Sequence, residues 1–296
     1  NGQIKFKQSF GRQKLSKFDI EFLNSFLMMR NLGEMHSRLS DRLGNHVDGL
    51  KITKELCPQT TEETSIENKN HNGTNIIARV NPTSNIQILI GAHWDTRPLA
   101  DQDEDSRNYK TPISGANDGA SGVAVLLELV DLLKANRPDI GINFVFFDAE
   151  DSGVSGENES YCQGSIYFAK NLPIKNIKEA IILDMVGDKQ LSLPIERNSL
   201  NFHGQLIRKL WDRAKTLKLD AFKGVVGPLI YDDHVPLYQY AGIPSIDIID
   251  FRYPNAFTNY WHTVEDTPEN CSPESLGQVG SLMVDYIFNR KFYNDN

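Results

Sequence analysis

The sequence predicts an α/β fold, with a central, twisted, mixed β-sheet that is flanked by helices on both faces. From residue 50 onward, β-rich segments alternate with longer amphipathic segments, which is the element order of an α/β protein. Segments such as 142–147 are almost wholly apolar, as expected for strands that are covered on both faces. The first connections along the chain are short, and this allows an antiparallel edge on the sheet.

The first half of the chain is expected to begin with helix and to continue with strands. Apolar side chains recur at three- and four-residue spacing within residues 12–46, so we expect residues 1–50 to form a helical extension packed on the core. The elements that follow are strands at 51–56, 75–80 and 86–92, a helix at 119–136 and a strand at 142–148.

The second half continues the same alternation to the end of the chain. Its expected elements are a helix at 163–171, a strand at 180–185, helices at 201–217 and 234–241, a strand at 245–249 and a helix at 273–290. No linker and no internal repeat interrupts this order, so we expect a single domain over residues 1–296.

The composition is that of an acidic globular protein. Of the 296 residues, 40% are hydrophobic and 24% charged, which excludes a disordered chain, and the net charge of −8 argues against a nucleic-acid-binding protein. No apolar run reaches the roughly 18 to 20 residues that a membrane span needs. We expect a monomer, and we assign no role to Cys57, Cys162 and Cys271, which are too few and too scattered for a disulfide scaffold.

Acidic and imidazole side chains follow several of the expected strands. Ligands of open α/β sheets bind beyond the carboxyl ends of the strands, so these residues are candidates for one shared site. A single acid in such a place is usually a turn residue, but the joint occurrence is harder to explain by turns alone. The segments concerned are His93-Trp94-Asp95, the helix start 115–122 with Asp118, Glu150-Asp151, Asp184 and Trp261-His262.

Carboxylates that converge on one site repel one another unless a cation lies among them. Imidazole and carboxylate ligands without a thiolate suit zinc with three protein ligands and one open position, while manganese and iron stay open as alternatives. Glu150 and Asp151 need separate roles, because successive side chains at a strand end point to opposite sides. One of them can hold the metal, and the other can act as a general base.

These motifs, in this order, resemble the zinc-dependent exopeptidases of the M28 type. The match extends over roughly residues 85–290. Two chemistries compete within that family, namely two-zinc aminopeptidases and the one-zinc glutaminyl cyclases of the animal type, which also occur in bacteria. The segment 231–237, with its Asp-Asp-His-x-Pro pattern, and the Trp261 that precedes His262 resemble the cyclases.

The resemblance implies a role for each residue of the motifs. The three zinc ligands would be Asp118, Asp151 and His262, and Glu150 would be the proton shuttle. Asp184 and Asp232 would form an acidic network beside Glu150, and Trp261 would be a wall of the substrate pocket.

The sequence departs from the animal cyclase pattern at three places. Asp151 stands where Glu is usual, which shortens the ligand by one methylene. The loop 152–161 has no Trp, so the pocket wall that a Trp forms there in the animal enzymes is expected from Tyr161, from Trp94 or from no residue. No pair of cysteines flanks the Asp118 segment.

The function that the resemblance implies is zinc-dependent cyclisation of N-terminal glutaminyl residues to pyroglutamate, with release of ammonia. It implies one Zn²⁺ per chain and peptide or protein substrates with N-terminal Gln. The alternative is a two-zinc aminopeptidase, in which His93 would bind the second metal together with Asp184 and a bridging Asp118. A binding module without catalysis is a third alternative. For a peptide-processing enzyme we expect a periplasmic or secreted location.

Overall fold

The computed structural model describes residues 50–58 and 72–293. The helical extension expected over residues 1–50 lies almost wholly outside the described residues, and only its last residue falls within them, as the start of a strand. Among the described residues, no helix is both long enough and apolar enough to span a membrane.

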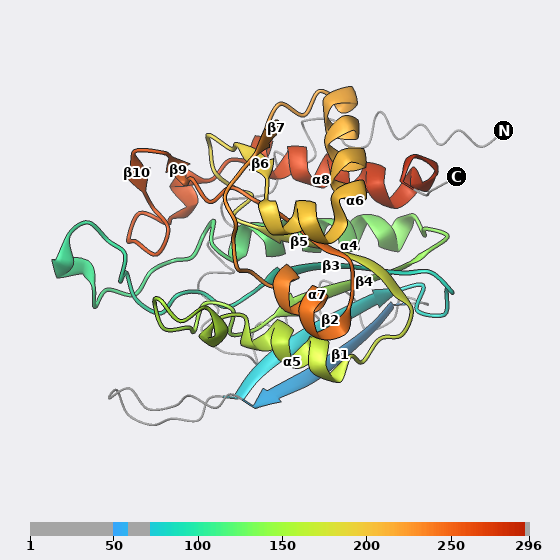
Figure 1. Cartoon of the computed structure of the whole chain (residues 1–296), viewed down its shortest axis with the longest axis horizontal. Coiled ribbons are helices and arrows are strands. Elements are labelled where there is room, and N and C mark those ends of the chain that lie inside the picture. The colour runs from blue at the N-terminus through green and yellow to red at the C-terminus, as the bar shows by residue number, and fades with distance from the viewer. Residues whose placement is uncertain (1–49, 59–71, 294–296) are drawn as a thin grey trace.

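A six-stranded mixed sheet forms the centre of the molecule (Figure 1). The strands at one edge are antiparallel to their neighbours, whereas β4, β3, β5 and β8 run parallel to one another. This confirms the mixed sheet with an antiparallel edge. In spatial order the strands are β1 (Leu50–Pro58), β2 (Asn72–Val80), β4 (Gly141–Phe147), β3 (Gln87–His93), β5 (Ile177–Asp184) and β8 (Ser245–Ile249).

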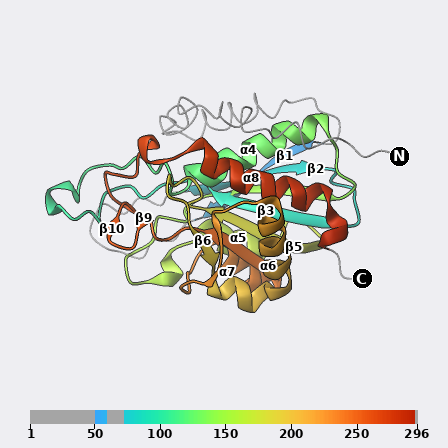
Figure 2. The ribbon, with the colours of Figure 1, turned by 90° about the horizontal axis from the view of Figure 1, so that it is seen from above.

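Helices cover both faces of this sheet, as the apolar strands predict (Figure 2). Successive side chains of a strand point to opposite faces, so β5 contributes Ile181 and Leu183 to one core and Ala180 and Ile182 to the other. The first core packs against α4 (Ala120–Ala135), α6 (Arg197–Leu217) and α8 (Pro273–Phe288), and the second against α5 (Gln163–Asn171) and α7 (His234–Ala241).

Most element boundaries agree with the sequence expectation to within a few residues, and those of α5, α7 and β8 coincide with it. Helix α6 begins four residues earlier than expected, because the Glu196 side chain caps it by accepting hydrogen bonds from the backbone N–H groups of Asn198 and Ser199.

Two small sheets were not predicted. They are the parallel pair β6 (Leu193–Ile195) with β7 (Phe222–Val226) and the antiparallel pair β9 (Pro254–Asn255) with β10 (Thr258–Asn259). Strands β6, β9 and β10 have only two or three residues, and the five residues of β7 are mostly exposed and form no continuous apolar run.

Candidate metal centre and catalytic pocket

The motif residues converge at the carboxyl edge of the parallel strands. His93 is the last residue of β3 and Asp184 the last of β5, while Asp151 lies just beyond β4. Asp118 precedes α4, and His262 lies in the loop after β10. All five side chains are buried. The chain therefore brings together the residues that the sequence placed after separate strands.

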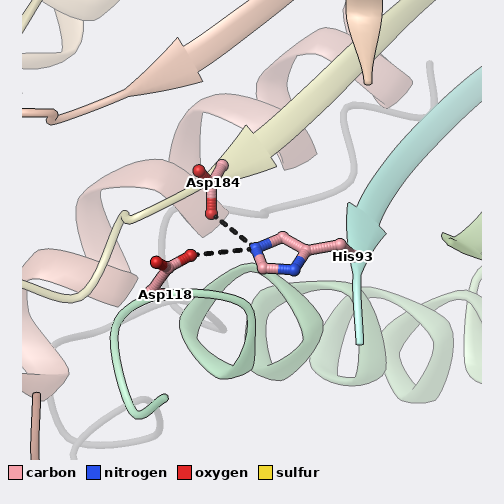
Figure 3. A group of neighbouring side chains, drawn as sticks. All are labelled: His93, Asp118 and Asp184. Carbon is pink, nitrogen blue, oxygen red and sulfur yellow. Dashed lines mark hydrogen bonds and ion pairs between the residues drawn. The ribbon is translucent and has the colours of Figure 1, made fainter. Parts of the chain in front are cut away.

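Asp118 lies between two imidazoles and faces a different one with each oxygen. Its Oδ1 is 3.1 Å from Nε2 of His93, and its Oδ2 is 3.2 Å from Nε2 of His262. Nε2 of His93 also lies 3.1 Å from Oδ1 of Asp184. Figure 3 marks the contacts of His93 with Asp118 and Asp184 by dashed lines. On the other side, Nε2 of His262 lies 2.9 Å from Oδ1 of Asp151.

Two sets of three side chains at this place could each hold a metal ion. One donor atom from each of Asp118, Asp151 and His262 lies within 4.8 Å of the others, and the same holds for His93, Asp118 and Asp184. These oxygen and imidazole donors are a set that zinc accepts. The first set is the trio that the resemblance implies, and the second is the set expected for a second metal in the aminopeptidase alternative.

The charges of this cluster fit a cation. Burial alone would lower the pKa of both imidazoles, but the surrounding carboxylates outweigh it. Asp151 and Asp118 raise the pKa of His262 to about 10, and Asp184 and Asp118 raise that of His93 well above its usual value. The raised pKa values show that the surroundings of both imidazoles favour positive charge, which a divalent cation would also supply.

The backbone around the ligands adopts left-handed conformations that non-glycine residues rarely take. The φ angles are 56° at Ala149, 48° at Met185 and 56° at His262. Such residues are disfavoured by about 1–3 kcal/mol each and persist only where the surroundings hold them, which is common at functional sites. Here Ala149 precedes the candidate proton carrier Glu150, Met185 follows the candidate ligand Asp184, and His262 is itself a candidate ligand.

Two further acids hold the backbone of the ligands in place. The Asp95 carboxylate accepts hydrogen bonds of 3.0 Å from the N–H groups of both Glu150 and Asp151. The Asp266 carboxylate accepts hydrogen bonds from the backbone N–H groups of Asn117 and Asp118, at 2.8 and 3.2 Å. Asp95 belongs to a motif that the sequence analysis quoted, but neither acid was assigned this role.

The glycine-rich segment before α4 allows Asp118 to reach the strand ends. Gly119 has a φ of 90°, and a Cβ there would lie 2.6 Å from the carbonyl oxygen of Asp95. A Cβ on Gly122 would lie 2.0 Å from the carbonyl oxygen of Leu183, so only glycine lets the helix start against β5. Asn117 ties the same segment to the loop after β5 by accepting a hydrogen bond from the N–H of Gly187.

A cavity of about 320 Å³ opens beside the candidate ligands. Trp261 lies in its lining and stacks on the His262 ring, with 3.8 Å between ring centroids. Tyr161, at the end of the loop 152–161, also lines the cavity. Further lining residues are Glu150, Asp184, Asp232, Leu229, Ile249 and Phe251.

Trp94 does not line this cavity, which corrects the expectation that it could form a pocket wall. Its indole N–H donates a 3.1 Å hydrogen bond to the carbonyl oxygen of Thr74 in β2, and its ring packs against the core. The reason is that this hydrogen bond holds the indole against β2.

Glu150 is a buried residue in the acidic part of the cavity wall. The pKa of its carboxyl group is raised well above the usual value, first by burial and then by the nearby charge of Asp151. Burial likewise raises the pKa of Asp184 to about 7. A carboxyl group with a raised pKa can take up and release a proton near neutral pH, as a proton shuttle must.

Cys162 is a contact of Glu150 that the sequence analysis missed. Its buried thiol donates a hydrogen bond to Oε1 of Glu150, with 3.2 Å between the heavy atoms. One donor atom from each of Glu150, Cys162 and Asp232 lies within 4.8 Å of the others. No local sequence pattern predicts this contact, because Cys162 comes 12 residues after Glu150 and the loop between them brings the two side chains together.

Comparison with known proteins places these motifs in a family. A sequence model of Peptidase family M28 matches residues 75–287. Aminopeptidase YwaD of Bacillus subtilis is 27% identical over 84% of this chain, and glutaminyl-peptide cyclotransferase of Bos taurus is 22% identical over 72%. The chain covers 52% of the length of the first relative and 65% of the second, less than two thirds of either.

Solved bacterial structures match over nearly the whole chain. A glutaminyl cyclase from Bacteroides thetaiotaomicron, bound to N-acetylhistamine, is 32% identical with a TM-score of 0.83, covering 95% of this chain and 98% of that one. A leucine aminopeptidase precursor from the same organism is also 32% identical, with a TM-score of 0.82 over 95% and 97%. Porphyromonas gingivalis glutaminyl cyclase is 31% identical, with a TM-score of 0.82 over 94% and 97%.

Another similar structure, from Parabacteroides distasonis, is described as a Zn-dependent exopeptidase. The fold is thus that of the zinc-dependent exopeptidases. With a family match over most of its length and the motif residues gathered at one sheet edge, the chain belongs to peptidase family M28.

Proposed function

We propose that the protein is a glutaminyl-peptide cyclotransferase, which converts an N-terminal glutaminyl residue to pyroglutamate and releases ammonia. The observation that carries this proposal is the arrangement of one cavity, in which Asp232 and Trp261 line the same space as Glu150. These two residues distinguished the cyclase pattern in the sequence. Bacterial structures described as glutaminyl cyclases, which cover this chain almost completely, support the proposal.

The size and walls of the cavity suit a single N-terminal residue. Its volume of about 320 Å³ lies at the lower end of the range for small-ligand sites. Trp261 and Phe251 offer apolar surface at the side of the cavity, and Glu150 and Asp232 offer carboxyl groups. A glutamine side chain has an apolar stem and a polar amide, and its α-amine can interact with an acidic wall.

Cyclisation joins the α-amine nitrogen to the side-chain γ-carbonyl carbon and breaks the bond from that carbon to the amide nitrogen. The reaction is intramolecular, so the enzyme must hold the chain in a ring-forming geometry and transfer one proton. A free α-amine has a pKa of about 8, so a base is needed at neutral pH. We assign to Glu150 the uptake of a proton from the attacking amine and its return to the leaving nitrogen, which departs as ammonia.

We assign one Zn²⁺ per chain to Asp118, Asp151 and His262, where it would supply Lewis-acid polarisation of the γ-carbonyl oxygen. The chain's own part at this place is to hold the three donor atoms. Asp95 fixes the peptide that joins Glu150 to Asp151, so that the proton carrier and the ligand keep opposite directions.

A two-zinc aminopeptidase is the second candidate, and one observation favours it. Nε2 of His93 is equally distant, at 3.1 Å, from Asp118 and Asp184, so the donor set for a second ion is intact (Figure 3). The relatives YwaD and the leucine aminopeptidase precursor carry names of this class. In this function Glu150 would take a proton from the attacking water.

One assay separates the two functions. The purified protein is incubated with a Gln-initiated peptide, with the same peptide acetylated at its N-terminus, and with an aminoacyl amide. The proposal expects ammonia and a pyroglutamyl product from the first substrate only. Release of free amino acids from the peptide or the aminoacyl amide, without pyroglutamate, would instead establish the aminopeptidase.

We also propose that the protein acts as a monomer on peptides or proteins with N-terminal Gln, and that it does so in the periplasm or outside the cell. The support for the location is the class of substrate alone. Fractionation of source cells and size-exclusion chromatography of the purified protein would test these two points.

A further inference from the structure

A second acidic pair lies behind Glu150, farther from the candidate ligands. Asp232 lines the cavity, whereas Asp247 in β8 is fully buried behind it. One donor atom from each of Asp232, His234 and Asp247 lies within 4.8 Å of the others. The sequence analysis singled out Asp232 but not Asp247, and the proposed chemistry does not use Asp247 directly.

The oxygens of this pair are short of hydrogen-bond donors. Asp232 accepts a hydrogen bond from the N–H of Asp233 with Oδ1, but its Oδ2 has no donor among the described residues. Both carboxyl oxygens of Asp247 also lack one within that part of the chain. Two ionised carboxylates can only accept, so a buried pair without donors is unfavourable unless the two groups share a hydrogen.

The groups packed around the pair do not supply enough positive charge to replace that hydrogen. Asp184 faces it from β5 and Glu196 from the start of α6, and both are acidic. Two imidazoles lower the pKa of Asp232, and both already face other acids. Nε2 of His234, from α7, lies 3.3 Å from Oε2 of Glu196, and Nε2 of His93 lies 3.1 Å from Asp118 and Asp184. Ser199 accepts the backbone N–H of Asp247 and donates its own hydroxyl hydrogen to Glu196, so it is already engaged.

We propose that Asp247 is a positioning residue: its carboxyl group donates a hydrogen bond to the carboxylate of Asp232 and so holds Asp232 in place beside Glu150. Burial and the charge of Asp232 raise the pKa of Asp247 well above its usual value, which is consistent with a neutral donor. The inference rests on the proposed function for the role of Asp232. It adds a second layer of acids, from β8, to the wall that faces the substrate.

The test compares two variants of Asp247 that differ in whether they can donate a hydrogen bond. Asp247→Asn keeps the shape and an N–H donor, and kcat should stay within about 3-fold of wild type. Asp247→Ala removes the donor from a buried acceptor, and kcat should fall about 10- to 100-fold with KM changed less than about 3-fold. Zinc content should be the same in both. If Asp247→Ala does not fold, Asp247→Leu replaces it.

Asp250→Asn is the matched control, because Asp250 is a buried acid that directly follows the end of β8, three residues after Asp247. Its carboxylate accepts hydrogen bonds from the N–H groups of Ser192 and Arg252, away from the cavity. This variant should keep wild-type kcat even if its melting temperature falls. A general loss of stability around β8 would therefore be separated from a loss of positioning.

Three outcomes would overturn the inference. They are wild-type kcat in a donor-free variant, an Asp247→Asn variant as slow as Asp247→Ala at equal stability, and loss of a bound metal ion with Asp247. If wild type hydrolyses aminoacyl amides and forms no pyroglutamate, the proposed function fails. In that case the Asp247 variants are assayed by the hydrolysis of aminoacyl amides, a reaction that also needs Glu150. A failure of the proposed function can thus be told apart from a failure of the inference about Asp247.

Discussion

His262 and Asp151 are 111 residues apart in sequence, yet Nε2 of His262 lies 2.9 Å from Oδ1 of Asp151. The acid extends from the end of a parallel strand, and the imidazole comes from a loop in which His262 itself takes a left-handed conformation. This contact closes the candidate metal centre around Asp118. It also places Trp261, which stacks on His262, at the wall of the cavity.

Replacing His262 should remove the metal. We expect His262→Ala to lose bound zinc and to lower activity by more than about 100-fold, beyond the loss typical of residues that only support a ligand. Metal analysis after dialysis, together with ammonia release, measures both effects. His203→Asn is the control, because His203 contacts Glu179 at the opposite end of β5. Full zinc content in His262→Ala would contradict the assigned ligand set.

Replacing Glu150 should stop the reaction without removing the metal. Glu150→Gln keeps the shape of the side chain but cannot carry the proton, so we expect kcat to fall about 10²- to 10⁴-fold. Zinc content and melting temperature should stay near the wild-type values. The exposed residue Glu157 offers the control substitution Glu157→Gln. An active Glu150→Gln enzyme would exclude Glu150 as the proton carrier.

Asp95 should matter for both stability and activity, because its two oxygens hold the N–H groups of Glu150 and Asp151. Asp95→Ala leaves both donors without an acceptor, and we expect the free energy of unfolding to fall by about 2 kcal/mol or more. Asp95→Asn keeps one acceptor oxygen and should show a smaller loss. Urea unfolding and ammonia release measure the two effects. Equal behaviour of Asp95→Ala and wild type would show that this acid does not hold the site.

The number of metal ions separates the two candidate functions. The cyclase proposal expects about one zinc per chain. It also expects His93→Ala to keep that ion, because His93 is not in its ligand set. The aminopeptidase alternative expects a second ion that is lost in His93→Ala. Metal analysis of both proteins after identical handling decides between them, and two ions in wild type would count against the one-zinc assignment.

Glu179 should make the stability of the protein depend on pH in the acid range. Burial alone would raise its pKa, but hydrogen bonds from His203, Tyr286 and Arg290 outweigh burial and lower it from 4.5 to about 2. A lowered pKa means that the ionised group stabilises the fold above the ordinary value of 4.5. This stabilisation is lost as the pH falls toward 2.

We therefore expect Glu179→Gln to lower the free energy of unfolding by about 2–3 kcal/mol at neutral pH, and by much less near pH 2 to 3. Denaturant unfolding at both pH values measures the difference, with Glu269→Gln at an exposed position as the control. A loss that is the same at both pH values would show that the contribution is not electrostatic.

Much of the architecture could be read from local patterns. The alternation of apolar strands with amphipathic helices predicted the mixed sheet, and the boundaries of α5, α7 and β8 were predicted to the residue. The period of apolar side chains depends only on the geometry of each element, so a single segment reveals it. Most acids and imidazoles of the site could be found in the same way, since they end or follow a strand or precede a helix, whereas His262 lies in a loop and was identified by its motif.

The contacts between those residues depended on how distant segments cross. Whether Tyr161 or Trp94 faces the pocket follows from the direction that each loop takes, and only the folded chain turns Trp94 toward β2. The thiol of Cys162 behind Glu150, and the carboxyl group of Asp247 behind Asp232, come from elements whose own patterns carry no sign of a site. Sequence shows which residues end a strand, whereas packing sets which of them meet, because burial and hydrogen bonding act between atoms that are close in space and far apart along the chain.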